Sequence, residues 1–158
     1  GQAWGLYGYT MAYRATGNTL FLEIAEKITA FIFDHPRLPL DLIPYWDFDA
    51  PEIPNAPRDA SAAAVTASAL YELGLLVPEK AEKYHRLANQ IVDNLIKDYL
   101  AKPSGLRGFL LDHSTGHLPH NHEIDVPLVY ADYYFLEALL RRKSLSESNS
   151  IFNITFAK

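Results

Sequence analysis

The segment Arg58-Asp59-Ala60-Ser61-Ala62-Ala63-Ala64 opens a helix that has almost no side-chain bulk at its start. The residues on its inward-facing stripe recur at helical spacing and are mostly small: Ala60, Ala63, Ala64, Ala67, Leu70 and Tyr71. A helix of this kind allows neighbouring backbones to approach closely. We therefore predict a tightly packed helix over about residues 59–75, with Asp59 as its N-cap or first-turn acid.

A long, proline-rich loop precedes this helix and places aromatic rings next to carboxylates. Its central part reads Pro44-Tyr45-Trp46-Asp47-Phe48-Asp49-Ala50-Pro51. The aromatic residues argue against disorder. Aromatic faces beside carboxylates suit a flat, hydroxyl-rich ligand such as a sugar ring. The loop therefore predicts an aromatic-lined pocket at the mouth of packed helices, and Trp46 and Arg58 are candidate substrate-binding residues.

The rest of the chain predicts further helices on both sides of this segment. Hydrophobic spacing and Gly or Pro breaks indicate helices over about residues 2–15, 19–35, 78–100 and 128–142. The first, third and fifth helices are rich in aromatic or small residues and follow loops rich in aromatic and polar residues. The second and fourth are ordinary amphipathic helices. This alternation favours an all-α fold of helical hairpins, with inner helices packed against outer ones. A short strand at residues 108–111 is a further expectation.

Composition limits the classes of function. The 158 residues suffice for one domain, and the net charge of −5 with scattered basic residues argues against a nucleic-acid surface. The absence of cysteine excludes disulfides, thiolate catalysis and Cys-ligated zinc. No apolar run reaches the length of a membrane span. The chain starts without Met in an apolar, aromatic segment, so we expect it to be part of a larger protein whose compartment stays open.

Two clusters of polar residues could carry chemistry. Asp47, Asp49 and Asp59 could act as general acids or bases, but structural roles are favoured, with Arg58 pairing to the loop acids. The second long loop contains four histidines and reads LDHSTGHLPHNHEID over residues 111–125. With Glu123 and Asp125 it could ligate a metal, but its spacing matches no standard zinc pattern. A substrate-contacting loop is the better interpretation.

Four motifs in one order resemble the unsaturated glucuronyl hydrolases, glycoside hydrolase family 88. They are Gly1-Gln2-Ala3-Trp4-Gly5, Tyr45-Trp46-Asp47-Phe48, Arg58-Asp59-Ala60-Ser61-Ala62-Ala63 and Ala131-Asp132-Tyr133-Tyr134-Phe135-Leu136-Glu137-Ala138-Leu139. The resemblance covers residue 1 to about residue 140 and implies the C-terminal half of an (α/α)6 barrel, a ring of six helical hairpins. We expect a partial barrel over residues 1–143 and a loosely ordered tail over residues 144–158.

The resemblance also implies an activity and a set of contacts. The family removes 4,5-unsaturated uronic acid from oligosaccharides left by polysaccharide lyases, without a metal or organic cofactor. Its catalytic aspartates lie upstream of the Gly1 motif, so this chain contains no catalytic residue and is expected to be inactive alone. Trp4 is carried over as a sugar-stacking residue, with Gln2 and His113 as pocket neighbours and His117 as a further candidate.

Other functions remain open at the level of sequence. The chain could be a non-catalytic helical binding or assembly module, which would self-associate through the open edge of the barrel. It could also belong to an unsaturated rhamnogalacturonyl hydrolase, a family that shares the barrel.

Overall fold

The computed structural model describes residues 1–102 and 108–155. Within these ranges five α-helices form, and two short 3-10 turns, Pro78–Lys80 and Leu118–His120, lie between them. The helices are α1 (Gln2–Thr16), α2 (Thr19–Phe33), α3 (Ala60–Leu76), α4 (Ala81–Asp98) and α5 (Val129–Thr155). The predicted all-α class is confirmed, and the starts of α1, α2, α3 and α5 fall within one residue of the predicted ones.

The helix boundaries follow from local chemistry. Gly17 ends α1 in the left-handed region at φ 69°, where a residue without Cβ has no steric penalty. Asn18 then caps α2 by accepting a hydrogen bond from the Leu20 backbone N–H. Asp59 caps α3 and accepts from the backbone N–H groups of Ser61 and Ala62, which confirms its predicted N-cap role.

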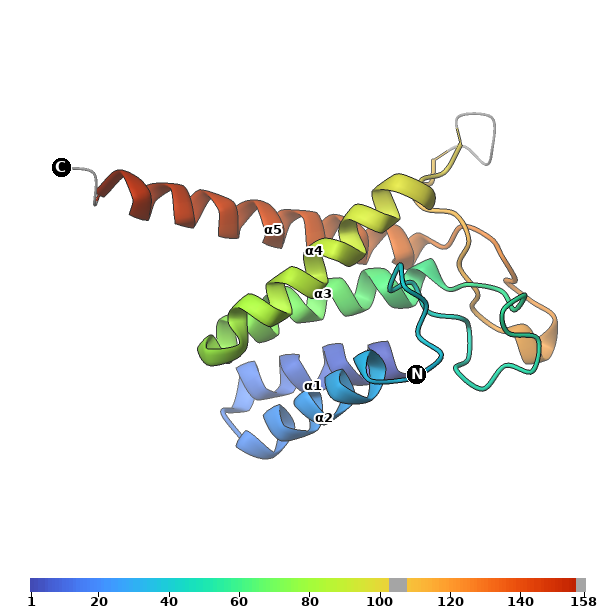
Figure 1. The fold of residues 1–158 in the computed structure, drawn as a ribbon, viewed down its shortest axis with the longest axis horizontal. Helices are drawn as coiled ribbons and strands as arrows, with labels where there is room; N and C mark the ends of the chain where they lie inside the picture. The colour runs from blue at the N-terminus through green and yellow to red at the C-terminus, as the bar shows by residue number, and fades with distance from the viewer. Residues whose placement is uncertain (103–107, 156–158) are drawn as a thin grey trace.

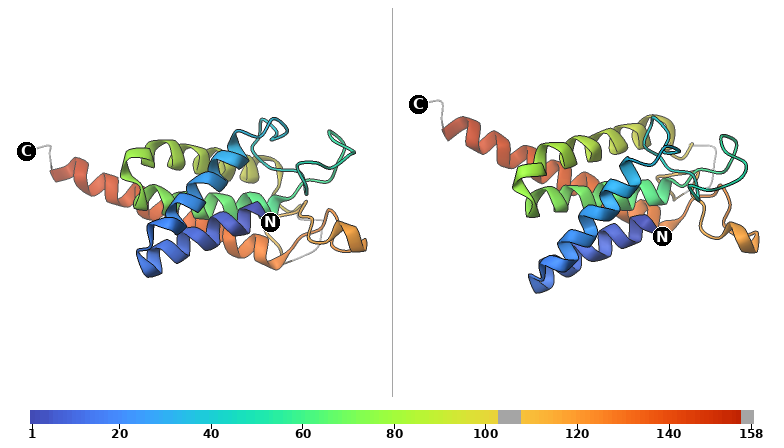
Figure 2. Two further views of the ribbon diagram at one scale, coloured as in Figure 1. Left: turned by 90° about the horizontal axis from the view of Figure 1, so that it is seen from below. Right: turned by 60° about the horizontal axis from the view of Figure 1, so that its bottom comes forward.

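Helix α3 lies at the centre of the molecule. It packs against α1, α4 and α5, and Figures 1 and 2 show it between them. Its residues from Ala60 to Gly74 are buried on nearly every side, apart from Ala62. A helix that is buried on all sides must pass close to its neighbours. The run of alanines allows this close approach, because alanine side chains are small.

The predicted layers are also present. Helices α1 and α5 flank α3, while α2 packs on α1 and α4 packs on α3. This is the inner and outer arrangement that the alternation of helix types predicted. Among the described residues, no helix combines the length and the apolar character needed to cross a membrane.

A buried ion-pair cluster ties the three inner helices together. Glu72 of α3 is largely buried, and its two carboxylate oxygens each lie 2.8 Å from a guanidinium nitrogen, one on Arg14 of α1 and the other on Arg141 of α5. Arg141 also donates to the Ser68 carbonyl oxygen at 2.7 Å. Since Arg14 stands near the end of α1, these contacts fix the helices at the far end from the loops.

Two expectations differ from the structure. Helix α5 continues to Thr155 rather than ending near Arg142, because residues 143–155 contain neither Pro nor Gly to stop it. Residues 108–111 form no strand; Leu111 makes only an isolated bridge to Leu100. The division into a barrel part, 1–143, and a tail, 144–158, stays a prediction.

Candidate functional site

The two long loops and the N-terminal ends of α1, α3 and α5 gather at one end of the molecule. Figure 1 shows the chain start beside these helix ends, with both loops projecting beyond them, and Figure 2 shows the same grouping from two other sides. Backbone hydrogen bonds join the loops to the helices: the Ala60 N–H donates to the His113 carbonyl at 3.1 Å, and the Asp59 N–H donates to the Pro44 carbonyl at 2.9 Å. This end of the bundle is the candidate site.

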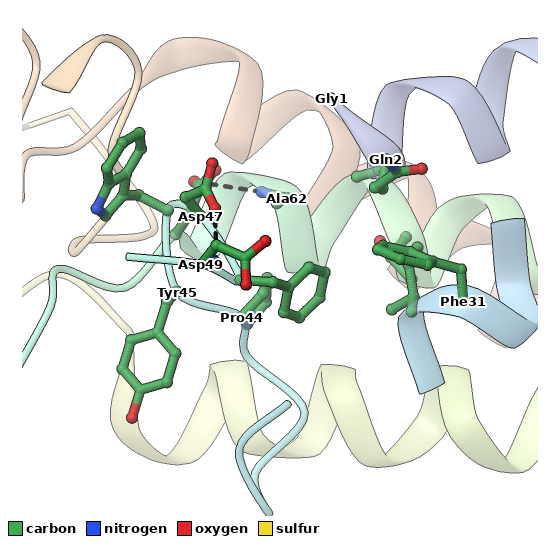
Figure 3. A pocket seen from close by; sticks show the side chains of 14 residues that line it. Gly1, Gln2, Phe31, Pro44, Tyr45, Asp47, Asp49 and Ala62 are labelled. Carbon is green, nitrogen blue, oxygen red and sulfur yellow. Dashed lines mark hydrogen bonds between the residues drawn. The ribbon is translucent and has the colours of Figure 1, made fainter. Parts of the chain in front are cut away.

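A pocket of about 340 Å³ lies between the first loop and the starts of α1 and α3. Figure 3 shows Asp47 and Asp49 of the loop on one side of it and Gln2 and Phe31 on the other. The lining residues are Gly1, Gln2, Ala3, Phe31, Ile32, Pro44, Tyr45, Trp46, Asp47, Phe48, Asp49, Asp59, Ala62 and Thr66. Aromatic rings and carboxylates therefore meet here as predicted, and the described lining residues include no Lys, Arg or His.

Asp59 is a half-buried acid that lines this pocket. Burial raises the pKa of its carboxyl, and hydrogen bonds from Ser61, Ala62 and Thr115 offset only part of that effect. The Ser61 hydroxyl donates to Asp59 Oδ1 at 2.6 Å, and the capping bonds from the Ser61 and Ala62 backbone N–H groups fall on the same oxygen. Asp47 also has a structural task, because its Oδ1 accepts from the Asp49 N–H at 2.7 Å.

Arg58 holds the first loop in place rather than pointing into this pocket. Its guanidinium pairs with Asp41, donates through Nε to the Ile43 carbonyl at 3.0 Å, and lies over the Tyr45 ring at 5.1 Å. The expected pairing of Arg58 with an acid of the first loop is present, and the partner is Asp41, whereas Asp49 pairs with Arg37 at 3.4 Å.

A second ring-bearing surface lies between α1 and α5, which we call the aromatic shelf and define as Trp4, Tyr130 and Tyr134. The Trp4 ring centroid is 5.9 Å from that of Tyr130 and 5.1 Å from that of Tyr134. Trp4 remains 46% exposed, so an open ring surface is available to a ligand. Burial raises the pKa of Tyr130, which keeps its hydroxyl protonated at neutral pH.

The histidines of the second loop are held by local contacts. His113 adopts a left-handed backbone at φ 65°, and its Nδ1 lies 2.7 Å from Asp125 Oδ1. The His117 ring packs against that of His120, with centroids 4.3 Å apart, and His117 forms a backbone bridge to His122. Within the described residues, no three His, Asp or Glu side chains are grouped closely enough to hold a metal ion.

The structure divides the six predicted site residues among several places. Gln2 and Trp46 line the pocket. Trp4 lies on the shelf, because residues two apart on a helix point about 200° apart. Arg58 and His113 line a separate cavity of about 500 Å³, together with Asp41 and Tyr99. His117 is not among the described residues that line these two cavities.

Sequence reasoning missed two residues of the site. Phe31 belongs to the hydrophobic stripe of α2, yet it is exposed and lines the pocket, since it stands near the end of that helix. Asp41 anchors Arg58 and also accepts a hydrogen bond from the Tyr99 hydroxyl at 3.1 Å. No sequence signal marks either role, because both depend on contacts across the fold.

The described residues thus form an all-helical bundle of layered hairpins with ring-rich surfaces and carboxylates at one end. Comparison with known proteins shows which proteins this chain is similar to. The chain is 52% identical, over 146 residues, to an unsaturated glucuronyl hydrolase of Formosa agariphila. It is 34% identical, over 144 residues, to an unsaturated glucuronyl hydrolase of Bacillus sp. strain GL1. No family model matches the sequence.

Solved structures give the same result. A crystal structure of an unsaturated glucuronyl hydrolase specific for heparin is 53% identical and superposes with a TM-score of 0.88, covering 92% of this chain and 39% of that one. The Bacillus sp. GL1 enzyme superposes with a TM-score of 0.82 over 89% of this chain. These neighbours have an (α/α)6 barrel fold, so the described helices correspond to part of that barrel.

The chain is therefore homologous to a segment of the unsaturated glucuronyl hydrolases. The match takes in 92% of this chain but only 36% of the Formosa agariphila relative, and 89% of this chain but 38% of the Bacillus sp. relative. The chain thus spans little more than a third of the relatives it matches.

Proposed function

We propose that this chain is the C-terminal portion of an unsaturated uronyl hydrolase, an enzyme that removes 4,5-unsaturated glucuronic acid from oligosaccharides produced by lyases. The observation that carries the proposal is 52% identity to an unsaturated glucuronyl hydrolase across 92% of the chain. The relatives are glucuronyl and chondroitin disaccharide hydrolases, which favours this function over a rhamnogalacturonyl hydrolase or a non-catalytic assembly module.

The chain would supply substrate contacts, while the proton donor belongs to another part of the enzyme. In the proposed reaction an aspartic acid protonates the 4,5 double bond, water adds at C5, and the resulting hemiketal opens to release the aglycone. Asp59 is a poor candidate for that acid, because its carboxylate is engaged as the cap of α3. Asp125 is paired with His113, and Asp49 with Arg37.

The substrate class we propose is an unsaturated uronic-acid oligosaccharide. One structural neighbour, a hydrolase from Streptococcus agalactiae, was solved in complex with dGlcA-GalNAc6S and superposes with a TM-score of 0.79 at 29% identity. The shelf suits such a ligand, because the apolar face of a pyranose ring packs against an aromatic face. The proposed substrate contacts also include Gln2 and Trp46 in the pocket and Arg58 and His113 in the second cavity. His117 of the second loop is a further proposed contact.

The test compares this 158-residue chain with the complete gene product that carries it. An unsaturated glucuronyl disaccharide loses its ultraviolet absorbance when the double bond is hydrated. We expect the complete protein to consume the disaccharide and the 158-residue chain to show no turnover, although circular dichroism should show it to be helical. Turnover by the isolated chain, or none by the complete protein, would contradict the proposal.

We also propose that the outer face of α5 is an open edge of the barrel, through which the isolated chain associates with a second copy. Large apolar side chains are exposed there at intervals of four, three and four residues, which we call the α5 stripe: Val129, Tyr133, Leu136 and Leu140. This spacing is that of a helix seam that packs against another helix. An exposed apolar stripe of this kind favours association.

A further inference from the structure

We infer that Tyr134 is a positioning residue that sets the angle of the Trp4 indole on the aromatic shelf. The inference rests on the proposed function, because it assigns to Tyr134 the task of orienting a ring that stacks on substrate. Tyr134 itself need not touch the sugar. Its role follows from the contacts on its two sides, one toward Trp4 and the other toward the helix core.

The contact with Trp4 has a defined geometry. The two rings meet nearly at right angles, with an interplanar angle of 82° and centroids 5.1 Å apart. Such edge-to-face pairs are favoured by the ring quadrupoles and lose energy when either ring turns. Tyr130 meets Trp4 from another position, at 5.9 Å and 55°. Two neighbours at different angles leave the indole one favoured orientation, while 46% of Trp4 stays exposed.

Tyr134 is in turn fixed from the core side. Its ring meets that of Tyr7 at 4.9 Å and 74°. The Tyr7 hydroxyl donates to Glu137 Oε1 at 3.1 Å, and the other oxygen of Glu137 accepts from the Ser68 hydroxyl. Burial, aided by the charge of Glu137, raises the pKa of Tyr7 to about 12, so the phenol stays a donor at neutral pH. Contacts therefore lead from α3 through Tyr7 to Tyr134 and Trp4.

The first experiment measures the mobility of Trp4 in the 158-residue chain. The protein has two tryptophans, so a Trp46→Phe background leaves Trp4 as the single indole fluorophore. We expect Tyr134→Ala to lower the fluorescence anisotropy of Trp4, and Tyr134→Phe to preserve it, because the ring rather than the hydroxyl makes the contact. Tyr9→Ala is the matched control, since Tyr9 of α1 is 36% exposed and its ring meets Phe21 of α2 rather than the shelf.

The second experiment measures kinetics in the complete gene product with an unsaturated disaccharide. Loss of one aromatic pair corresponds to about a 2- to 10-fold change in an equilibrium constant. We expect Tyr134→Ala to raise KM by about that factor with kcat nearly unchanged, because the misoriented indole weakens binding in the ground state and the transition state alike. Tyr134→Phe should restore the KM of the wild type.

The outcomes separate the two proposals. If the wild-type complete protein hydrates no unsaturated disaccharide, the proposed function fails, and the anisotropy measurement still decides whether Tyr134 fixes Trp4. If turnover is present but Tyr134→Ala changes neither anisotropy nor KM in a variant that remains folded by circular dichroism, the positioning role is wrong. An equal loss in Tyr134→Phe would also overturn it, because the hydroxyl would then be the functional group.

Discussion

Asp59 shows how one residue serves both the fold and the pocket. It caps α3, lines the pocket, and receives a backbone hydrogen bond from Thr115 of the second loop at 3.4 Å. Its carboxylate therefore joins the helix start to the second loop, while its backbone N–H donates to Pro44 of the first loop. Such a residue could be recognised in the sequence as a cap, but its contact with Thr115, 56 positions along the chain, could not.

The raised pKa of Asp59 predicts a pH dependence of stability. The folded state holds the proton more tightly than the unfolded chain, where an aspartate titrates near about pH 3.9. The stabilisation from the bound proton is thus complete below that pH and is lost as pH rises through the folded pKa. We expect Asp59→Asn, which keeps an acceptor for the cap, to lose less stability than the wild type between about pH 4 and pH 7.

Urea denaturation at a series of pH values measures this difference directly. The difference between the two proteins isolates Asp59 from groups such as Glu26, whose pKa is lowered through its bonds to Lys80 and Tyr84 despite its partial burial. Parallel curves of unfolding free energy against pH for the wild type and Asp59→Asn would contradict this prediction. They would show that the pKa of the Asp59 carboxyl is the same in the folded and unfolded states.

At the scale of the element, α3 depends on its small residues. Ala67 is fully buried where α3 passes its neighbours. Adding a larger side chain there should force the helices apart, so we expect Ala67→Leu to cost about 1–3 kcal/mol of unfolding free energy. Leu75→Ala in the same helix is the control, because Leu75 is exposed, and it should change the free energy by less than about 0.5 kcal/mol.

Thermal and urea unfolding of the two variants test this prediction. A stable Ala67→Leu protein, with an unfolding free energy equal to that of the wild type, would mean that α3 has space beside it and that close approach is not required at this position.

The elements differ in how much of them could be predicted. Gly17, Asn18 and Asp59 mark breaks and caps chemically, so the corresponding helix ends were within reach of sequence reasoning. Pro78 begins a 3-10 turn rather than the predicted helix, and α4 starts at Ala81. The end of α5 was not, because residues after Arg142 lose hydrophobic spacing without containing a residue that stops a helix. Hydrophobic spacing reports packing, whereas a helix can continue without it.

The site was less predictable than the helices. The pocket of rings and carboxylates followed from the loop composition, and Trp46 and Gln2 line it. The partner of Arg58 did not follow, because pairing depends on how the loop folds back rather than on separation in sequence. The opposite directions of Gln2 and Trp4 could have been deduced from their spacing on the helix alone.

For the molecule as a whole, the α5 stripe predicts association of the isolated chain. We expect the 158-residue chain to form dimers as its concentration rises, because the stripe is apolar and exposed. Replacing Leu136 and Leu140 together by Gln should shift it toward the monomer without loss of helix, since both side chains are exposed in this structure.

Sedimentation equilibrium and light scattering measure this association. The paired replacement of Leu20 and Leu75 by Gln, two exposed leucines on other helices, is a control that should leave the association unchanged. A wild-type chain that stays monomeric at all concentrations would mean that the α5 stripe does not mediate self-association.

The ion pairs of Glu72 affect how much conformational entropy is lost when a ligand binds. Because α1 and α5 are each joined to α3 by a guanidinium, a change in the tilt of either helix draws that guanidinium away from the largely buried Glu72 carboxylate. The rings at the opposite end of these helices consequently stand at a spacing established during folding. A sugar would then meet a preorganised surface, and little conformational entropy would be lost when it docks.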